Sequence, residues 1–503
     1  MNSKDINLNL YGVYLIKKYL IKFNDNDKMI HLFLAQIDIE YMLLFISLLN
    51  KNNKKLSSEI LYIFISISYP KNGEEIFLLD EKILLSISTF LGKNKNDSNL
   101  IKYGIWLIRN IIFNDKICDI FLNYNIIAFF EEIYERHLLD NDLMRQLILC
   151  IKKIISYKFD LYQNNKNIDI LCLIPTIKII KTQLKPNLPP NILSSNTYQL
   201  YYLTLFKSSD IFYKMTEFKI HKEVMNLYPI IIQKSIEINN KLKEIESNEN
   251  KNIINFNNNE EKKQLKIYLE NYINIEIYIL KMLAKIISLE DGILTQILID
   301  SGIAQFLNFV LQSDDPKIIK NACVCISNIC CGTCGQMGNL YENNTFIELI
   351  KVSKNIYEAL VYNSKCKDEY YKCLIDTFRE INYSFTFAII NSIYEKIIPL
   401  ARYDNFFVVL LLIKGLDYLN DKKIDECIEF ILKALYKLFI YDRDEIKKDV
   451  SNNNNNYINF AEFMEKNGLK ESLEKLLSTN KNNKISFMAE RVYNSIFNDF
   501  EKI

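Results

Sequence analysis

A tryptophan and an asparagine at helical spacing are the residues of this sequence best suited to bind a ligand. Trp106 is the only tryptophan of the chain, and Asn110 follows four residues later, so on a helix both side chains lie on one face. An indole gives a flat wall for the stem of a lysine or arginine and attracts its charge. The amide can donate to and accept from a peptide backbone. The pair predicts a site for an extended basic peptide; the alternative is that Trp106 is a core aromatic residue.

A second segment, Val324 to Asn328, keeps the asparagine and has valine in place of the tryptophan. A cluster of thiols surrounds it, and its last two members have the spacing of half a zinc knuckle. Because most of the cluster falls on a predicted helix, we interpret the thiols as buried structural residues and expect no metal site. The five thiols are Cys323, Cys325, Cys330, Cys331 and Cys334.

Nothing in the sequence indicates catalysis. The three histidines, His31, His137 and His221, are far apart and form no metal-binding spacing. We find no glycine-rich phosphate loop, no Gly-x-Ser-x-Gly turn and no paired histidines with a glutamate. We therefore expect a protein that is not an enzyme and needs no cofactor.

Charge and composition narrow the class of partner. The chain has 62 basic and 61 acidic residues, for a net charge of +1, whereas a protein that binds nucleic acid through phosphates usually has a basic excess. No apolar run is long enough to span a membrane. The eleven cysteines form no disulfide framework, which is typical of reduced thiols in the cytoplasm or nucleus. We expect neither nucleic acid nor membrane as a partner.

The elements that position these residues are predicted to be helices throughout. Apolar residues recur three and four residues apart, as at Ile60, Ile63, Phe64 and Ile67. Only 11 glycines and 8 prolines interrupt the chain, which argues against a β-rich fold. Polar breaks such as 51–54, 93–97 and 313–316 separate the helices at intervals of roughly 40 residues, the period of armadillo and HEAT arrays. The sequence thus predicts an all-α solenoid whose inner helices line a groove.

The chain is expected to divide into a short N-terminal segment, residues 1–30, and a solenoid over residues 31–503. Polar insertions are expected near 239–263, which is rich in Asn, Glu and Lys, and near 451–456, which contains a run of asparagines. Such sequences are typical of solvated loops.

Three stretches, 103–133, 292–350 and 460–497, resemble the importin-α family when each is considered together with its flanking residues. The family's motifs occur in these stretches in its order: Trp106, Asn110, Asn114-Asp115 and Cys118; then Thr295-Gln296, Asp300-Ser301-Gly302, Lys320-Asn321-Ala322-Cys323, Ile326-Ser327-Asn328-Ile329 and Gln336; and last Glu465-Lys466-Asn467-Gly468-Leu469 with Leu473-Glu474-Lys475-Leu476.

The resemblance implies an armadillo-repeat, right-handed α-solenoid of about ten repeats. It also implies an adaptor for nuclear import, present in cytoplasm and nucleus, that binds the basic localisation-signal peptides of cargo proteins. Trp106 would stack on a lysine stem, Asn110 would hold the peptide backbone, and Asp115, or Asn114 beside it, would pair with the lysine ammonium. Asn328 would anchor a second, weaker site. Tyr62 and Ser66 take the places of Trp and Asn in the second repeat.

The departures from the family favour a second hypothesis. In the fourth repeat Lys153 falls at the asparagine position, where it would repel a basic cargo. The family's Arg/Lys-rich segment for the carrier importin-β is replaced, in the first 30 residues, by scattered lysines. The alternative to the adaptor is therefore a non-transport armadillo scaffold that mediates protein–protein interaction.

Overall fold

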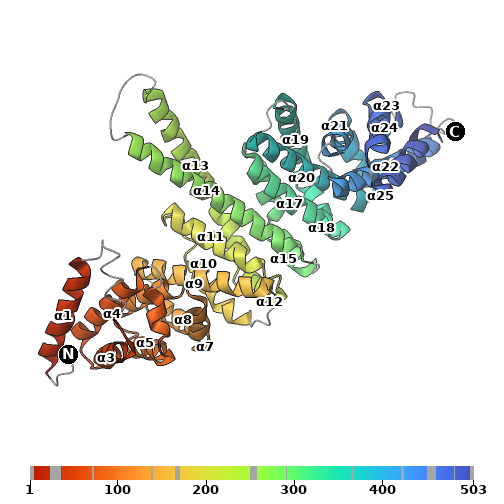
Figure 1. Cartoon of the computed structure of the whole chain (residues 1–503). Helices are drawn as coiled ribbons and strands as arrows, with labels where there is room; N and C mark the ends of the chain where they lie inside the picture. The colour runs from red at the N-terminus through yellow and green to blue at the C-terminus, as the bar shows by residue number, and fades with distance from the viewer. Residues whose placement is uncertain are drawn as a thin grey trace. The chain divides into compact units, whose positions relative to one another are not determined.

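A computed structural model describes the chain over residues 5–22, 36–70, 73–137, 140–164, 170–249, 258–289, 292–363, 368–420, 424–449, 460–480 and 482–498. Every regular element in these ranges is a helix, so the all-α prediction is confirmed (Figure 1). The chain separates into two compact units, residues 1–218 (unit 1) and 219–503 (unit 2).

In unit 1 five helices pack side by side in chain order, α1 on α4, α4 on α6, α6 on α9 and α9 on α11. We call these the ladder helices of unit 1. The shorter helices between them join and cover this row. The elements of unit 1 are α1 (Ile6–Lys22), α3 (Ile39–Leu49), α4 (Lys54–Ser68), the 3₁₀ helix η1 (Gly73–Leu78), α5 (Glu81–Lys93), α6 (Ser98–Ile111), α7 (Asp115–Asn123), α8 (Ile126–Arg136), α9 (Asn141–Gln163), the 3₁₀ helix η2 (Leu171–Leu173), α10 (Ile174–Thr182), α11 (Pro190–Thr204) and α12 (Ser209–Glu217).

Unit 2 repeats the arrangement. Its ladder helices are α14, α17, α20, α22 and α25, each packed on the next, and α13 packs along α14 as a long hairpin (Figure 1). The elements of unit 2 are α13 (Ile220–Glu249), α14 (Asn258–Ile287), α15 (Gly292–Asp300), α16 (Ile303–Val310), α17 (Pro316–Cys330), α18 (Cys334–Glu342), α19 (Thr345–Tyr362), α20 (Glu369–Asn391), α21 (Tyr394–Asn420, with a kink at 403–406), α22 (Asp425–Asp449), α23 (Phe460–Lys466), α24 (Leu469–Thr479), α25 (Asn483–Tyr493) and the π-helical turn η3 (Asn494–Asn498).

The polar breaks predicted from the sequence mark helix starts. Asn53, Asp97 and Asp315 are the N-caps of α4, α6 and α17, and each side chain accepts a hydrogen bond from a backbone N–H of the first turn. That bond satisfies one of the donors that a helix start leaves without a partner. Each ladder helix then buries an apolar stripe against its neighbours, as α6 does with Ile101 and Ile105.

Two expectations about organisation differ from what the structure shows. Residues 239–249 and 258–263 of the expected polar insertion lie in α13 and α14, and 250–257 lie outside the described residues. Glu and Lys are good helix formers, and an ion pair between Lys262 and Glu246, at 3.4 Å, joins the two helices, so this polar sequence extends the hairpin. In the segment 1–30, α1 packs on α4 as a ladder helix. The asparagine run at 451–456 lies outside the described residues.

Within the ranges that the structure describes, no single helix combines the length and the apolar character needed to cross a membrane. The helices α15 and α16 are long and apolar enough only when they are taken together, and the chain bends by 72° between them.

Candidate functional site

Trp106 lies on the surface of unit 1. It sits on α6 with 37% of its side chain exposed, while its neighbours Ile105 and Leu107 are fully buried. The ring is therefore not a core residue of this unit, and part of it is accessible to a ligand. Lys102, four residues before it, and Arg109, three residues after it, lie on the same side of the helix.

The two cations beside Trp106 are not equivalent. Lys102 Nζ pairs with a carboxylate oxygen of Asp142 on α9 at 3.0 Å, and this hydrogen bond raises the pKa of the lysine. Arg109 Nη1 instead donates to Oε1 of the neutral Gln146 at 2.7 Å. Among the described residues no carboxylate pairs with Arg109, so its positive charge remains available beside the indole.

Asn110 reaches back to the preceding ladder helix. Its Nδ2 donates to Oγ of Ser68, the last residue of α4, at 3.1 Å, and the Ser68 hydroxyl donates to the Ile65 carbonyl. One side of the amide thus joins α6 to α4, and no hydrogen bond links the amide oxygen to another described residue. Trp106 and Asn110 therefore occupy one helix, one turn apart, as the sequence predicts.

The residues expected to pair with a cargo lysine already have a lysine of this chain. Asn114 is the N-cap of α7, where its side chain accepts from the Lys116 backbone N–H. Asp115 begins α7 and pairs with Lys153 Nζ of α9 at 3.4 Å, and the same ammonium lies 5.8 Å from the centre of the Phe113 ring. Beside them is a cavity of about 510 Å³ that Asn114 and Asp115 line together with Glu75, Leu78, Leu79 and Lys116.

The counterpart of the pair in the second repeat is occupied in the same way. Lys17 of α1 places its Nζ 4.4 Å from the centre of the Tyr62 ring and 2.7 Å from a Glu59 carboxylate oxygen. The Ser66 hydroxyl donates to the Tyr62 carbonyl of its own helix. Tyr62 therefore stacks against a lysine, as the resemblance suggests for a cargo, but this lysine comes from α1.

In unit 2 Asn328 belongs to a regular set of contacts between ladder helices. Its Nδ2 donates at 3.0 Å to the Ala284 carbonyl in the last turn of α14. In the same way Asn391 of α20 donates to the Cys330 carbonyl that ends α17, at 2.9 Å. Lys437 of α22 donates to two carbonyls at the end of α20, at 2.7 and 2.9 Å. The Cys330 and Ile390 carbonyls are among those that helix ends leave without a backbone donor, whereas the Ala284 carbonyl also accepts from the Ser288 N–H at 2.9 Å. The bond from Asn328 therefore joins α17 to α14.

Asn391 and the aromatic residue one turn before it were not predicted from the sequence as a site. Phe387 precedes Asn391 by four residues, the same aromatic-and-asparagine spacing that marks Trp106 and Asn110. The Phe387 ring stacks with Tyr383, with centres 5.8 Å apart, and lies 4.8 Å from the Phe430 ring of α22. Lys433 in turn places its ammonium 5.1 Å from the centre of Phe430. A search for this spacing with any aromatic residue would have found the pair.

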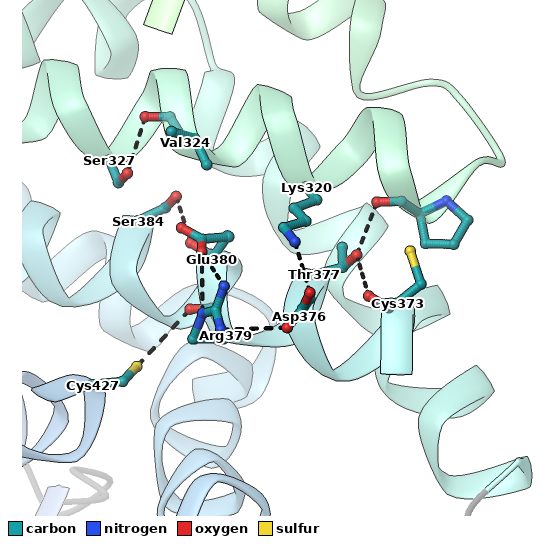
Figure 2. A network of polar contacts seen from close by, with 11 residues as sticks. Lys320, Val324, Ser327, Cys373, Asp376, Thr377, Arg379, Glu380, Ser384 and Cys427 are labelled. Atoms are coloured by element: carbon teal, nitrogen blue, oxygen red, sulfur yellow. Dashed lines mark hydrogen bonds and ion pairs between the residues drawn. The ribbon is translucent and has the colours of Figure 1, made fainter. Parts of the chain in front are cut away.

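The face between α17 and α20 carries a charge network rather than an acidic surface (Figure 2). Lys320 Nζ of α17 pairs with Asp376 of α20 at 2.7 Å, and Arg379 pairs with both Asp376, at 3.3 Å, and Glu380, at 2.9 Å. Burial alone would lower the pKa of Arg379, but the hydrogen bond to Glu380 and the two negative charges raise it. Two cations and two carboxylates compensate one another here.

The thiol cluster divides by position. Cys323, Cys325 and Cys330 are buried in α17, and burial holds the pKa of each thiol far above its usual value. Cys331, directly after α17, and Cys334, the first residue of α18, are exposed. Within the described residues no group of three or more Cys, His, Asp or Glu side chains is placed to hold a metal ion.

Comparison with known proteins identifies the repeat. Residues 294–331, which span most of α15 and all of α16 and α17, match the family model of the armadillo/beta-catenin-like repeat. No curated protein sequence matches the chain.

Two solved structures share its fold over nearly the whole chain. An engineered protein superposes with a TM-score of 0.60 at 13% identity, covering 98% of this chain and 96% of that one. A structure from work on a phosphorylation switch that controls the interaction between cadherin and beta-catenin superposes with a TM-score of 0.61 at 12% identity, covering 98% and 84%. The chain therefore has the fold of an armadillo-type α-solenoid. The finer assignment to importin-α does not follow from these matches.

Proposed function

We propose that this chain is a protein-binding scaffold whose ladder helices bind an extended segment of a partner protein, and that the segment beside Trp106 is neutral or acidic. The observation that carries the proposal is the exposed indole of Trp106 between Lys102 and Arg109 on one helix face. Asp142 balances the charge of Lys102, so a basic peptide stacked on this ring would meet the uncompensated charge of Arg109, whereas an acidic side chain would be attracted by it.

Each side chain then has a defined task. Trp106 provides an apolar wall for a side chain of the peptide, and the amide oxygen of Asn110 accepts a backbone N–H. Arg109 pairs with a peptide carboxylate, for which its planar guanidinium is well suited. Because an exposed ion pair is worth only about 0.2–1 kcal/mol, we expect Arg109 to alter peptide preference by a few-fold.

The contacts made by Asp115 and Tyr62 support the same proposal. Both could hold a cargo lysine, and both already hold a lysine of this chain, Lys153 and Lys17. A basic peptide would have to displace these side chains before it gained their contacts. The proposed function corresponds to the second hypothesis from the sequence, a non-transport armadillo scaffold.

The experiment uses the single tryptophan as the reporter. Trp106 fluorescence is titrated with two peptides of equal length, one rich in Lys and Arg and one with Asp and Glu at the same positions, at physiological salt. We expect the acidic peptide to change the emission at lower concentration, and the Arg109→Glu variant to reverse the order. The Lys414→Glu variant in unit 2, which changes the net charge equally, should keep the original order.

A nuclear import adaptor is the second candidate, and one observation favours it. The cavity of about 510 Å³ beside Asp115 also has Glu75 in its wall, and these carboxylates would suit a lysine of a localisation signal. Such an adaptor would work in cytoplasm and nucleus. If the basic peptide binds below about 10 µM, and labelled-peptide anisotropy shows that Trp106→Ala removes this binding, the adaptor replaces the scaffold as the proposed function; this affinity corresponds to about 7 kcal/mol.

A further inference from the structure

A carboxyl group is buried in the middle of the α13–α14 hairpin. Glu276 on α14 is only 3% exposed, and no ion pair reaches it in the described part of the chain. Burial raises the pKa of Glu276 to about 7, and the charge of Asp315 adds to the shift. The hydroxyl of the fully buried Tyr228 lies near Glu276 and lowers that pKa somewhat, although it makes no hydrogen bond to any residue that the structure describes.

The Glu276 side chain lines a cavity of about 440 Å³ within unit 2, which we call the Glu276 pocket. Its volume lies within the range of small-ligand sites. Within the described part of the chain no lysine, arginine or histidine lines the pocket, so no described cation in its wall compensates the carboxylates. The apolar part of the wall is formed by Ile232, Ile236, Leu269, Ile273, Phe309 and Ile318.

Two more carboxylates lie at one side of the pocket. Asp315 is the N-cap of α17, and its carboxylate already accepts a hydrogen bond from the Lys317 backbone N–H at 2.7 Å. Asp314 is exposed beside it. The pocket thus combines apolar walls, one buried carboxyl and a second carboxylate at its rim.

We propose that the Glu276 pocket receives an arginine side chain from a segment of a partner protein. The methylene stem would pack on the isoleucine wall, and the guanidinium would pair with Glu276 and Asp314. Arginine fits better than lysine because its guanidinium is more weakly hydrated and matches carboxylates in a planar fork. This site is separate from the Trp106 face and does not depend on its function.

The surface around the pocket indicates a protein rather than a free organic cation. Ile236 in the wall of the pocket is 49% exposed, and Ile232, Leu269 and Ile273 in the same wall are half-buried. Apolar side chains grouped at a surface are typical of protein interfaces. A bound segment would cover them, whereas a small cation would not.

The test is calorimetric titration of the full chain with two peptides, Ac-Ala-Leu-Arg-Leu-Ala-NH2 and its analogue with citrulline, the neutral isostere of arginine. We expect the arginine peptide to bind at least about tenfold more tightly, which corresponds to about 1.4 kcal/mol. The Glu276→Gln variant should remove this difference. Glu270→Gln, an equal change at an exposed position on the same helix, should retain it.

A second variant tests the proposal even if Glu276→Gln does not fold. Ile236→Lys places an ammonium in the wall of the pocket at a half-exposed position, and it should weaken the arginine peptide about tenfold. Ile230→Lys on the same helix is its control and should not. Equal binding of both peptides to the unchanged chain, or a tenfold preference that survives Glu276→Gln, would overturn the proposal. Binding of n-butylguanidinium as tight as that of the peptide would overturn the assignment to a protein segment.

Discussion

Two buried titratable groups of unit 2 should make opposite contributions to stability between pH 7 and pH 5. His221 on α13 is 2% exposed; its Nε2 contacts Ser301 Oγ at 3.1 Å, and its Nδ1 has no hydrogen-bond partner among the residues that the structure describes. Burial, with a smaller effect of the Lys222 charge, lowers the pKa of His221 to about 4 from 6.5. The pKa of Glu276 is raised to about 7 from 4.5 by burial.

The signs follow from which state binds more protons. The unfolded chain protonates His221 first, so the stability that neutral His221 contributes is present above pH 6.5 and is lost as the pH falls toward 4. The folded chain protonates Glu276 first, so its contribution is present below pH 4.5 and is lost as the pH rises through 7. Between pH 7 and pH 5 each change amounts to about 2 kcal/mol, and the two nearly cancel.

Urea unfolding of variants at both pH values separates the two effects. The free energy of unfolding of Glu276→Gln, taken as a difference from that of the unchanged chain, should fall by about 2 kcal/mol as the pH falls from 7 to 5. His221→Gln should gain about the same amount relative to the unchanged chain. All other titrating groups are common to the compared proteins and drop out. If both differences are independent of pH, the burial assigned to these groups is incorrect.

Three further outcomes are expected. Asn391→Ala should lower the free energy of unfolding by about 1–2 kcal/mol in urea titrations, because the carbonyl that ends α17 loses its donor; unchanged stability would count against a structural role. Lys153→Ala frees Asp115, so a Lys/Arg-rich peptide should bind more tightly in anisotropy titrations, and equal affinity would mean that the ion pair does not compete with the peptide. In timed alkylation with iodoacetamide, mass spectrometry should find Cys331 and Cys334 modified before the buried thiols of α17; simultaneous modification would contradict their burial.

The sequence alone determined the features that depend on near neighbours in the chain. The three- and four-residue apolar period and the caps at Asn53, Asp97 and Asp315 set the helices, because capping and amphipathic packing involve residues within one or two turns. The spacing of Trp106 and Asn110 likewise placed both on one helix. The same local rules applied to an Asn-rich stretch predicted a loop near 239–263, where the described residues continue the hairpin.

The contacts of these side chains depend on how distant parts of the chain pack together. Lys153 meets Asp115 across 38 residues of sequence, and Lys17 meets the Tyr62 ring, because each ladder helix packs on the helix of the next repeat. The burial of Glu276 between α13 and the start of α17 depends on the same stacking. No local pattern distinguishes a carboxylate that faces water from one that a neighbouring repeat covers, since both occupy ordinary helical positions.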